Sequence, residues 1–101
     1  MVNVSQEEKN IIDKVEESVC KYFSVPNQRI INKDMTSQVS LARGYIFYIL
    51  HVDKKISINK IANVYLRQKR VVFWNVSKIR HLLKLKVYKE IYVNICEILN
   101  M

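Results

Sequence analysis

The scarcity of turn-forming residues is the strongest constraint on this chain. Pro26 and Gly44 are the one proline and the one glycine among 101 residues. All-β folds place many such residues in their turns, so strands cannot be the main elements here. Half of the residues are hydrophobic, which is too many for a disordered chain. We therefore predict a single all-α domain over 1–101, compact and built from five or six helices.

The first helix is predicted from its capping signal and its apolar spacing. Ser5 and Glu8 have the spacing of a capping box, which satisfies free N–H groups at a helix start. A helix over Ser5–Phe23 would bury one apolar stripe, formed by Ile11, Val15, Val19 and Tyr22. Pro26 ends this helix, and a short helical turn over 27–32 follows.

The most apolar part of the chain lies near its middle. Eight of the ten residues from 41 to 50 are apolar, so we predict that Ser37–Val52 is a central helix enclosed by the others. The apolar run is interrupted by Arg43 and is shorter than the roughly 18 residues of a transmembrane helix. The N-terminus has no leader-like pattern, and Cys20 and Cys96 resemble buried thiols of the reduced cytoplasm. We expect a cytoplasmic protein.

Three further helices are predicted in the C-terminal half. Ser57 caps a short helix over 58–65, and a polar break over 66–69 follows it. The next helix runs over 70–83, and the last over about 87–99. Apolar spacing predicts the three buried faces: Ile58, Ile61, Ala62 and Tyr65; Val72, Val76, Ile79 and Leu83; Val87, Ile91, Ile95 and Ile98.

The positive charge is confined to the same half. Residues 1–50 hold six basic and six acidic side chains, whereas residues 51–101 hold 11 basic and three acidic ones, which accounts for the whole net charge of +8. Such asymmetry indicates a polyanionic partner, either nucleic acid or an anionic membrane surface. The last helix carries Lys89 alone among cations, which is a poor pattern for a membrane-surface helix.

The segment Ser57–Ile79 has the pattern of a helix-turn-helix, which we extend over about 57–83. Ala62 provides the small side chain needed where two such helices cross, and Val72 and Val76 hold the second helix against the first. In this motif the early residues of the second helix meet base edges in the major groove. We therefore expect the chain to bind double-stranded DNA.

The candidate DNA-binding residues surround the start of the second helix. Arg67, Lys69 and Arg70 are suited to phosphates or guanine, and Gln68 to a base edge. Residues further along the same helix face away from the predicted core, and Trp74 among them has the alternative of packing against the last helix. The full set is Lys60, Arg67, Gln68, Lys69, Arg70, Val71, Trp74, Asn75 and Lys78.

From about Ile11 to Ile79 the sequence resembles the C-terminal DNA-binding domain of the bacterial replication initiator DnaA. Five stretches match that family in order: IIDKVEESVCKYFSV, RIINK, VSLARGYIFYIL, SINKIANVY and RQKRVVFWNVSKI. The resemblance implies a Trp-repressor-like helical fold and a role in replication or transcription regulation. There is no GxxxxGK[ST] run for an ATPase domain, so a stand-alone relative of phage or mobile-element type is implied.

The resemblance also implies roles for individual residues. Arg43 stands where the family has an arginine that reaches the minor groove, and Arg67 matches the arginine of the family's Arg-Asp-His-Thr-Thr-Val signature. The next four residues, Gln68 to Val71, differ from that signature, so a different recognition sequence is expected.

Two other classes of function were weighed against DNA binding. His51 and His81 lie 30 residues apart with no carboxylate spacing for a metal site, and no catalytic triad pattern is present. We expect no enzyme activity, cofactor or metal. The stronger alternative is a protein-interaction module, in which Trp74 with Phe73 and Val71 meets a protein partner or a second copy as a homodimer.

Overall fold

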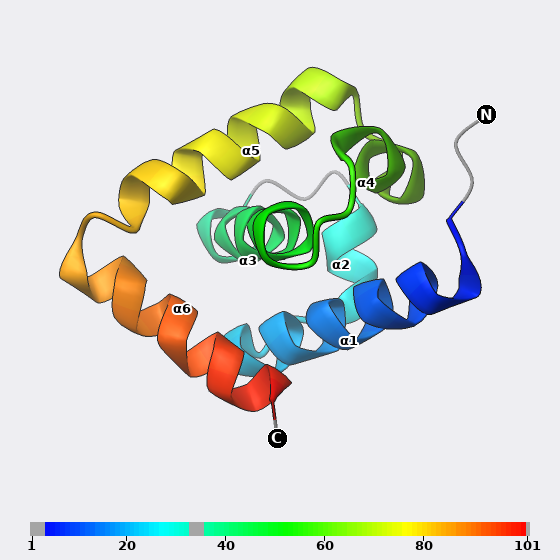
Figure 1. Ribbon diagram of the computed structural model, residues 1–101. Coiled ribbons are helices and arrows are strands. Elements are labelled where there is room, and N and C mark those ends of the chain that lie inside the picture. Colours follow the sequence, from blue (N-terminus) through cyan, green and yellow to red (C-terminus); the bar gives the residue numbers. More distant parts are fainter. Residues whose placement is uncertain (1–3, 33–35, 101) are drawn as a thin grey trace.

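The structure is a computed structural model that describes residues 4–32 and 36–100 (Figure 1). Six α-helices and one π-helical turn account for most of these residues, and no strand occurs among them. The elements are α1 Gln6–Phe23, α2 Asn27–Ile31, α3 Ser37–Tyr48, η1 Ile49–Asp53, α4 Ile58–Tyr65, α5 Lys69–Leu82 and α6 Lys86–Leu99. The prediction of a compact all-α fold with five or six helices is confirmed.

The helix α3 lies at the centre of the molecule. In Figure 1 it is seen nearly along its axis, with α5, α4, α1 and α6 arranged around it. Seven of its twelve residues are buried, namely Val39, Ala42, Arg43, Gly44, Tyr45, Ile46 and Phe47. The predicted central helix is therefore confirmed, although its last turn widens into η1 instead of continuing as an α-helix to Val52.

A glycine allows α5 to lie close against α3. A Cβ atom on Gly44 would lie 3.0 Å from the Cδ1 atom of Ile79 in α5, which is tighter than normal packing. The sequence had assigned the small residue at a helix crossing to Ala62 in α4. Gly44 provides a second close approach, between α3 and α5.

The helix α1 begins as predicted but buries a wider face. The Ser5 hydroxyl accepts from the backbone N–H of Glu8, and the Glu8 carboxylate accepts from the backbone N–H of Ser5, so the capping box is present. Val15 and Val19 are buried, but the ends of the predicted stripe are only partly so, and the buried set is Ile12, Val15, Ser18, Val19, Cys20 and Phe23. The face is wider because both α3 and α6 contact this helix.

The predicted inward position of Val87 in α6 is wrong. Its side chain is 58% exposed, whereas Ile95 and Leu99 near the other end are buried. The C-terminal part of α6 runs alongside α1, and its beginning extends to the corner that joins it to α5 (Figure 1). The apolar spacing identified the helix, but in its first turn it is Tyr88 that is half-buried, with its carbonyl accepting from the Tyr45 hydroxyl of α3, and Val87 points to solvent. Among the described residues, no helix is both long and apolar enough to cross a membrane.

Candidate nucleic-acid interface

Two helices joined by a three-residue turn, α4 and α5, form the most basic part of the molecule. Ser57 caps α4, since its hydroxyl accepts a backbone N–H three residues on at 3.2 Å. Leu66 ends α4 in the left-handed conformation with φ 55°, and the following N–H donates to the carbonyl of Ala62 at 2.9 Å. The chain re-enters a helix at Lys69. The predicted helix over 70–83 therefore begins and ends one residue earlier.

The inner faces of both helices match the prediction closely. Ile61, Ala62 and Tyr65 of α4 are buried, and so are Val72, Val76 and Ile79 of α5. Ile58 and Leu83 are partly buried against the same core. The opposite face of α5 is consequently directed outward.

Two contacts hold α4 on α1. The Nζ atom of Lys60 lies 2.8 Å from a carboxylate oxygen of Glu8, and the Tyr65 hydroxyl donates to Glu16 at 2.7 Å. The hydrogen bond from Lys60 holds the pKa of the Glu8 carboxyl below its ordinary value, and burial raises the pKa of Tyr65. Lys60 was expected to flank DNA, but its ammonium group already has an acidic partner.

No carboxylate occurs between Lys54 and Lys89, a stretch that holds 11 cations. Any ion pair of these cations must therefore come from elsewhere in the chain, as it does for Lys60. Among the residues that the structure describes, the exposed cations of α5, α6 and the corner between them have no ion pair: Lys69, Arg70, Lys78, Arg80, Lys84, Lys86 and Lys89. This surface carries uncompensated positive charge.

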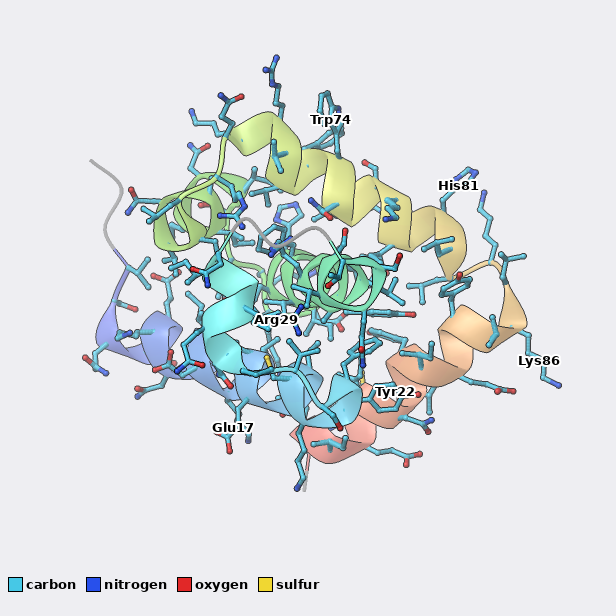
Figure 2. The ribbon with its side chains drawn as sticks, turned by 180° about the vertical axis from the view of Figure 1, so that it is seen from behind. Glu17, Tyr22, Arg29, Trp74, His81 and Lys86 are labelled. Atoms are coloured by element: carbon cyan, nitrogen blue, oxygen red, sulfur yellow. The ribbon has the colours of Figure 1, made fainter. Side chains whose placement is uncertain are left out.

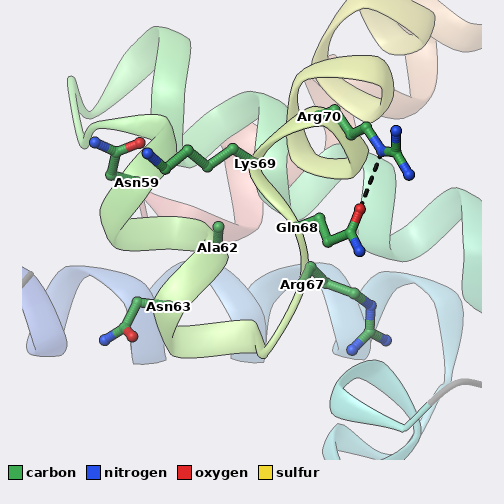
Figure 3. Close-up of a pocket in the computed structure, with 7 residues that line it drawn as sticks. All are labelled: Asn59, Ala62, Asn63, Arg67, Gln68, Lys69 and Arg70. Carbon is green, nitrogen blue, oxygen red and sulfur yellow. Dashed lines mark hydrogen bonds between the residues drawn. The ribbon is translucent and has the colours of Figure 1, made fainter. Parts of the chain in front are cut away.

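An open groove lies between α4 and the start of α5 (Figure 3). It is lined by Asn59, Ala62, Asn63, Arg67, Gln68, Lys69 and Arg70. The two asparagines are spaced four residues apart and lie on the same side of α4 as Ala62. Sequence reasoning missed them, although their spacing beside Ala62 is visible in the sequence.

Arg67 borders this groove, but its guanidinium extends to α2 (Figure 3). Its guanidinium donates to the carbonyls of Ile31 at 3.0 Å and Asn32 at 2.7 Å, and to that of Tyr65 at 2.8 Å. The carbonyls at the end of a helix carry partial negative charge, so a cation there is favourable. Arg67 therefore ties the α4–α5 turn to the end of α2 instead of projecting from the helix tip as expected.

Arg43 donates to the same end of α2 from the other side. Its guanidinium bonds the carbonyls of Ile30 and Asn32, each at 2.8 Å, and that of Arg29 at 3.2 Å. The side chain is only 4% exposed. This geometry does not support the minor-groove contact predicted for Arg43, because the guanidinium is buried and held by three carbonyls of the protein.

The outer face of α5 begins with three side chains that contact one another in series. The Oε1 atom of Gln68 accepts a hydrogen bond from Nε of Arg70 at 3.0 Å, and the guanidinium carbon of Arg70 lies 5.7 Å from the centre of the Trp74 ring. Trp74 is 60% exposed and Phe73 is 56% exposed. Figure 2 shows Trp74 projecting away from the body of the protein. The alternative that Trp74 packs against the last helix is wrong.

The remaining predicted DNA-binding residues of α5 lie partly on its outer face and partly beside α3. Lys78 is exposed, one turn beyond Trp74. Asn75 is half-buried, and its Nδ2 donates to the carbonyl of Val71 at 2.9 Å, while its Oδ1 lies 3.6 Å from where a Cβ on Gly44 would be. Asn75 therefore lies beside α3 and not on the outer face as predicted, and Val71 is half-buried next to it.

The described residues contain no cluster of three or more histidine, cysteine or acidic side chains that could hold a metal ion. Burial raises the pKa of the Cys20 thiol to about 11, so the thiol is protonated and unreactive at neutral pH. No protein-family model matches the chain, and no curated protein matches it significantly.

Proposed function

We propose that this protein binds double-stranded DNA with α4 and α5 acting as a helix-turn-helix. The observation that carries the proposal is the exposed positive start and outer face of α5, within a stretch that has no carboxylate. A protein that neutralises phosphates with Lys and Arg releases counterions from DNA, and this release drives binding. Gln68 and Arg70 are of the types that read base edges in the major groove.

The set of proposed DNA contacts is smaller than the sequence indicated. Arg43 and Arg67 hold α2, Lys60 pairs with Glu8, and Asn75 lies against α3. The proposed contacts are Asn59, Gln68, Lys69, Arg70, Trp74 and Lys78. The resemblance to the initiator's DNA-binding domain supports a cytoplasmic regulator or replication accessory of phage or mobile-element type.

The proposal is tested with a triple substitution, Lys69→Ala, Arg70→Ala and Lys78→Ala, by fluorescence anisotropy on a labelled random duplex. At low salt we expect binding to weaken by at least 30-fold, estimated as about threefold or more per lost phosphate contact, and the salt dependence to fall by about one unit per contact. The matched control replaces Lys9, Lys14 and Lys21, three exposed cations of α1. Equal losses in both variants, or no binding by folded wild type, would contradict the proposal.

A second candidate function is favoured by the exposed apolar side chains. Leu66, Phe73 and Trp74 are more than half exposed at one end of α5 and its turn. Exposed apolar groups close together are typical of protein contacts. A protein partner or homodimer through this face predicts concentration-dependent assembly in sedimentation equilibrium, which Trp74→Ala would abolish.

A further inference from the structure

Trp74 is the one tryptophan of the chain, and it lies on the outer face of α5. Burying a tryptophan is among the largest apolar gains available to a small protein, yet this ring leaves 60% of its surface in solvent. Its neighbours along the helix are one turn away on each side, Arg70 before it and Lys78 after it, and both are exposed. The ring is therefore an exposed aromatic surface with a cation at each end.

The ring is also held in place. Arg70 lies over it, with 5.7 Å between the guanidinium carbon and the ring centre, and Gln68 fixes Arg70 through the hydrogen bond described above. A side chain that is already ordered loses less entropy when a ligand covers it. Arg70 covers part of the ring, and the exposed remainder is open to a flat ligand.

We propose that Trp74 stacks on an unpaired nucleobase, so that the α5 face prefers DNA with bases out of the double helix over fully paired duplex. This inference rests on the proposed function and specifies its substrate. In closed duplex each base is covered above and below by its neighbours, and the grooves offer only base edges. A tryptophan flanked by cations matches the pattern of single-strand binding, in which aromatic rings stack on bases while cations follow the phosphates.

A closed duplex would use this face less well. In a closed duplex the indole can meet only base edges and the sugar-phosphate backbone, whereas an opened site offers the face of a base to the ring. Arg70 and Lys78, each one turn from the ring, are the cations placed to meet the phosphates that flank the open base.

Because Trp74 is the sole tryptophan, tryptophan emission excited where the six tyrosines do not absorb reports on this ring alone. The experiment titrates the full chain with three oligonucleotides of equal length, a closed duplex, the same duplex with a central unpaired bubble, and the single strand, and follows anisotropy and tryptophan emission together. We expect the bubble and the single strand to quench the emission strongly, the closed duplex to quench it weakly, and the bubble to bind about tenfold more tightly than the closed duplex.

Two variants separate stacking from charge. Trp74→Ala is expected to lose the tenfold preference for the bubble, and Trp74→Phe to retain most of it, because a phenyl ring still stacks. Phe73→Ala is the control for a neighbouring aromatic. Equal affinities and equal quenching on closed duplex and bubble would overturn the inference while leaving the proposed function standing. Absence of an anisotropy change with all three oligonucleotides would instead overturn both.

Discussion

Two regions of this molecule use the same kind of side chain for opposite purposes. At the C-terminal end of α2, Arg43 and Arg67 give their guanidiniums to backbone carbonyls and lose their availability to a partner. On the outer face of α5, Arg70 lies three residues from Arg67 in the sequence, yet its contacts are with Gln68 and Trp74 at the surface. In the first region the cations bind the protein itself, and in the second they are exposed to solvent.

This difference shows that the direction in which an arginine side chain faces decides whether it stabilises the fold or is available to a partner. The turn at 66–68 redirects the chain between α4 and α5, and across it Arg67 faces α2 while Arg70, in the first turn of α5, faces outward. The α2 region lies beneath the turn and anchors it. We infer that the inner arginines fix where α5 points, and that the outer cations act on whatever α5 meets.

The largest effect is expected for Arg43→Ala. This substitution removes a buried guanidinium with three carbonyl acceptors, of which the Asn32 carbonyl keeps a hydrogen bond from Arg67. We expect the free energy of unfolding to fall by about 3 kcal/mol, measured by urea denaturation. At temperatures where the variant is folded, its affinity for duplex DNA should stay within about twofold of wild type. A variant of normal stability that has lost affinity would restore the minor-groove role.

The helices could be predicted from the sequence because their signals are local. The N-caps, the central apolar run and the stripes of α4 and α5 are set by residues within a few turns of one another. The two caps at Ser5 and Ser57 and the inner residues Val72, Val76 and Ile79 are found where they were expected.

The site could be predicted only in part. The predictions that failed concern side chains whose partners lie far away in the sequence. The acceptor of Arg67 at Asn32 is 35 residues away, and the partner of Lys60 at Glu8 is 52 residues away. Neither spacing leaves a periodic signal. Helical periodicity places Trp74 on the outer side of α5, but no local pattern says that α6 diverges and leaves the ring uncovered. The sequence therefore shows which cations exist, and the fold decides which remain exposed.

A smaller effect is expected for Arg67→Ala, compared with Arg70→Ala as its matched control. Both remove one positive charge from neighbouring positions, but Arg67 bonds carbonyls of the protein whereas Arg70 lies at the surface. We expect Arg67→Ala to lower the free energy of unfolding by about 1 kcal/mol and Arg70→Ala to change it by less than about 0.5 kcal/mol. Affinity for DNA should show the reverse order. If Arg67→Ala leaves stability unchanged and weakens binding as much as Arg70→Ala, then Arg67 acts on DNA like Arg70. The assignment of Arg67 to the fold would then be wrong.

The smallest effect is expected for Glu8→Gln. This variant tests whether Lys60 serves the fold, as Arg43 and Arg67 do, or is available to DNA, as Arg70 is. Glutamine preserves the capping box with Ser5 but removes the charge that faces Lys60 at 2.8 Å. Because the folded-state pKa of Glu8 lies below its ordinary value of 4.5, the ion pair stabilises the protein above that pH, and this stabilisation is lost as the pH falls through the lowered pKa. Wild type should therefore be slightly more stable than Glu8→Gln at pH 7, and the two should converge in acid.

The same variant releases Lys60 for DNA. We expect its affinity for duplex at low salt to rise modestly, by up to about twofold, since one more cation becomes available to a phosphate. Glu17→Gln removes an equal charge from an exposed position on α1 and controls for the change in net charge. An equal rise in both variants would show that only net charge matters. A rise confined to Glu8→Gln would show that the ion pair with Glu8 keeps Lys60 from binding DNA.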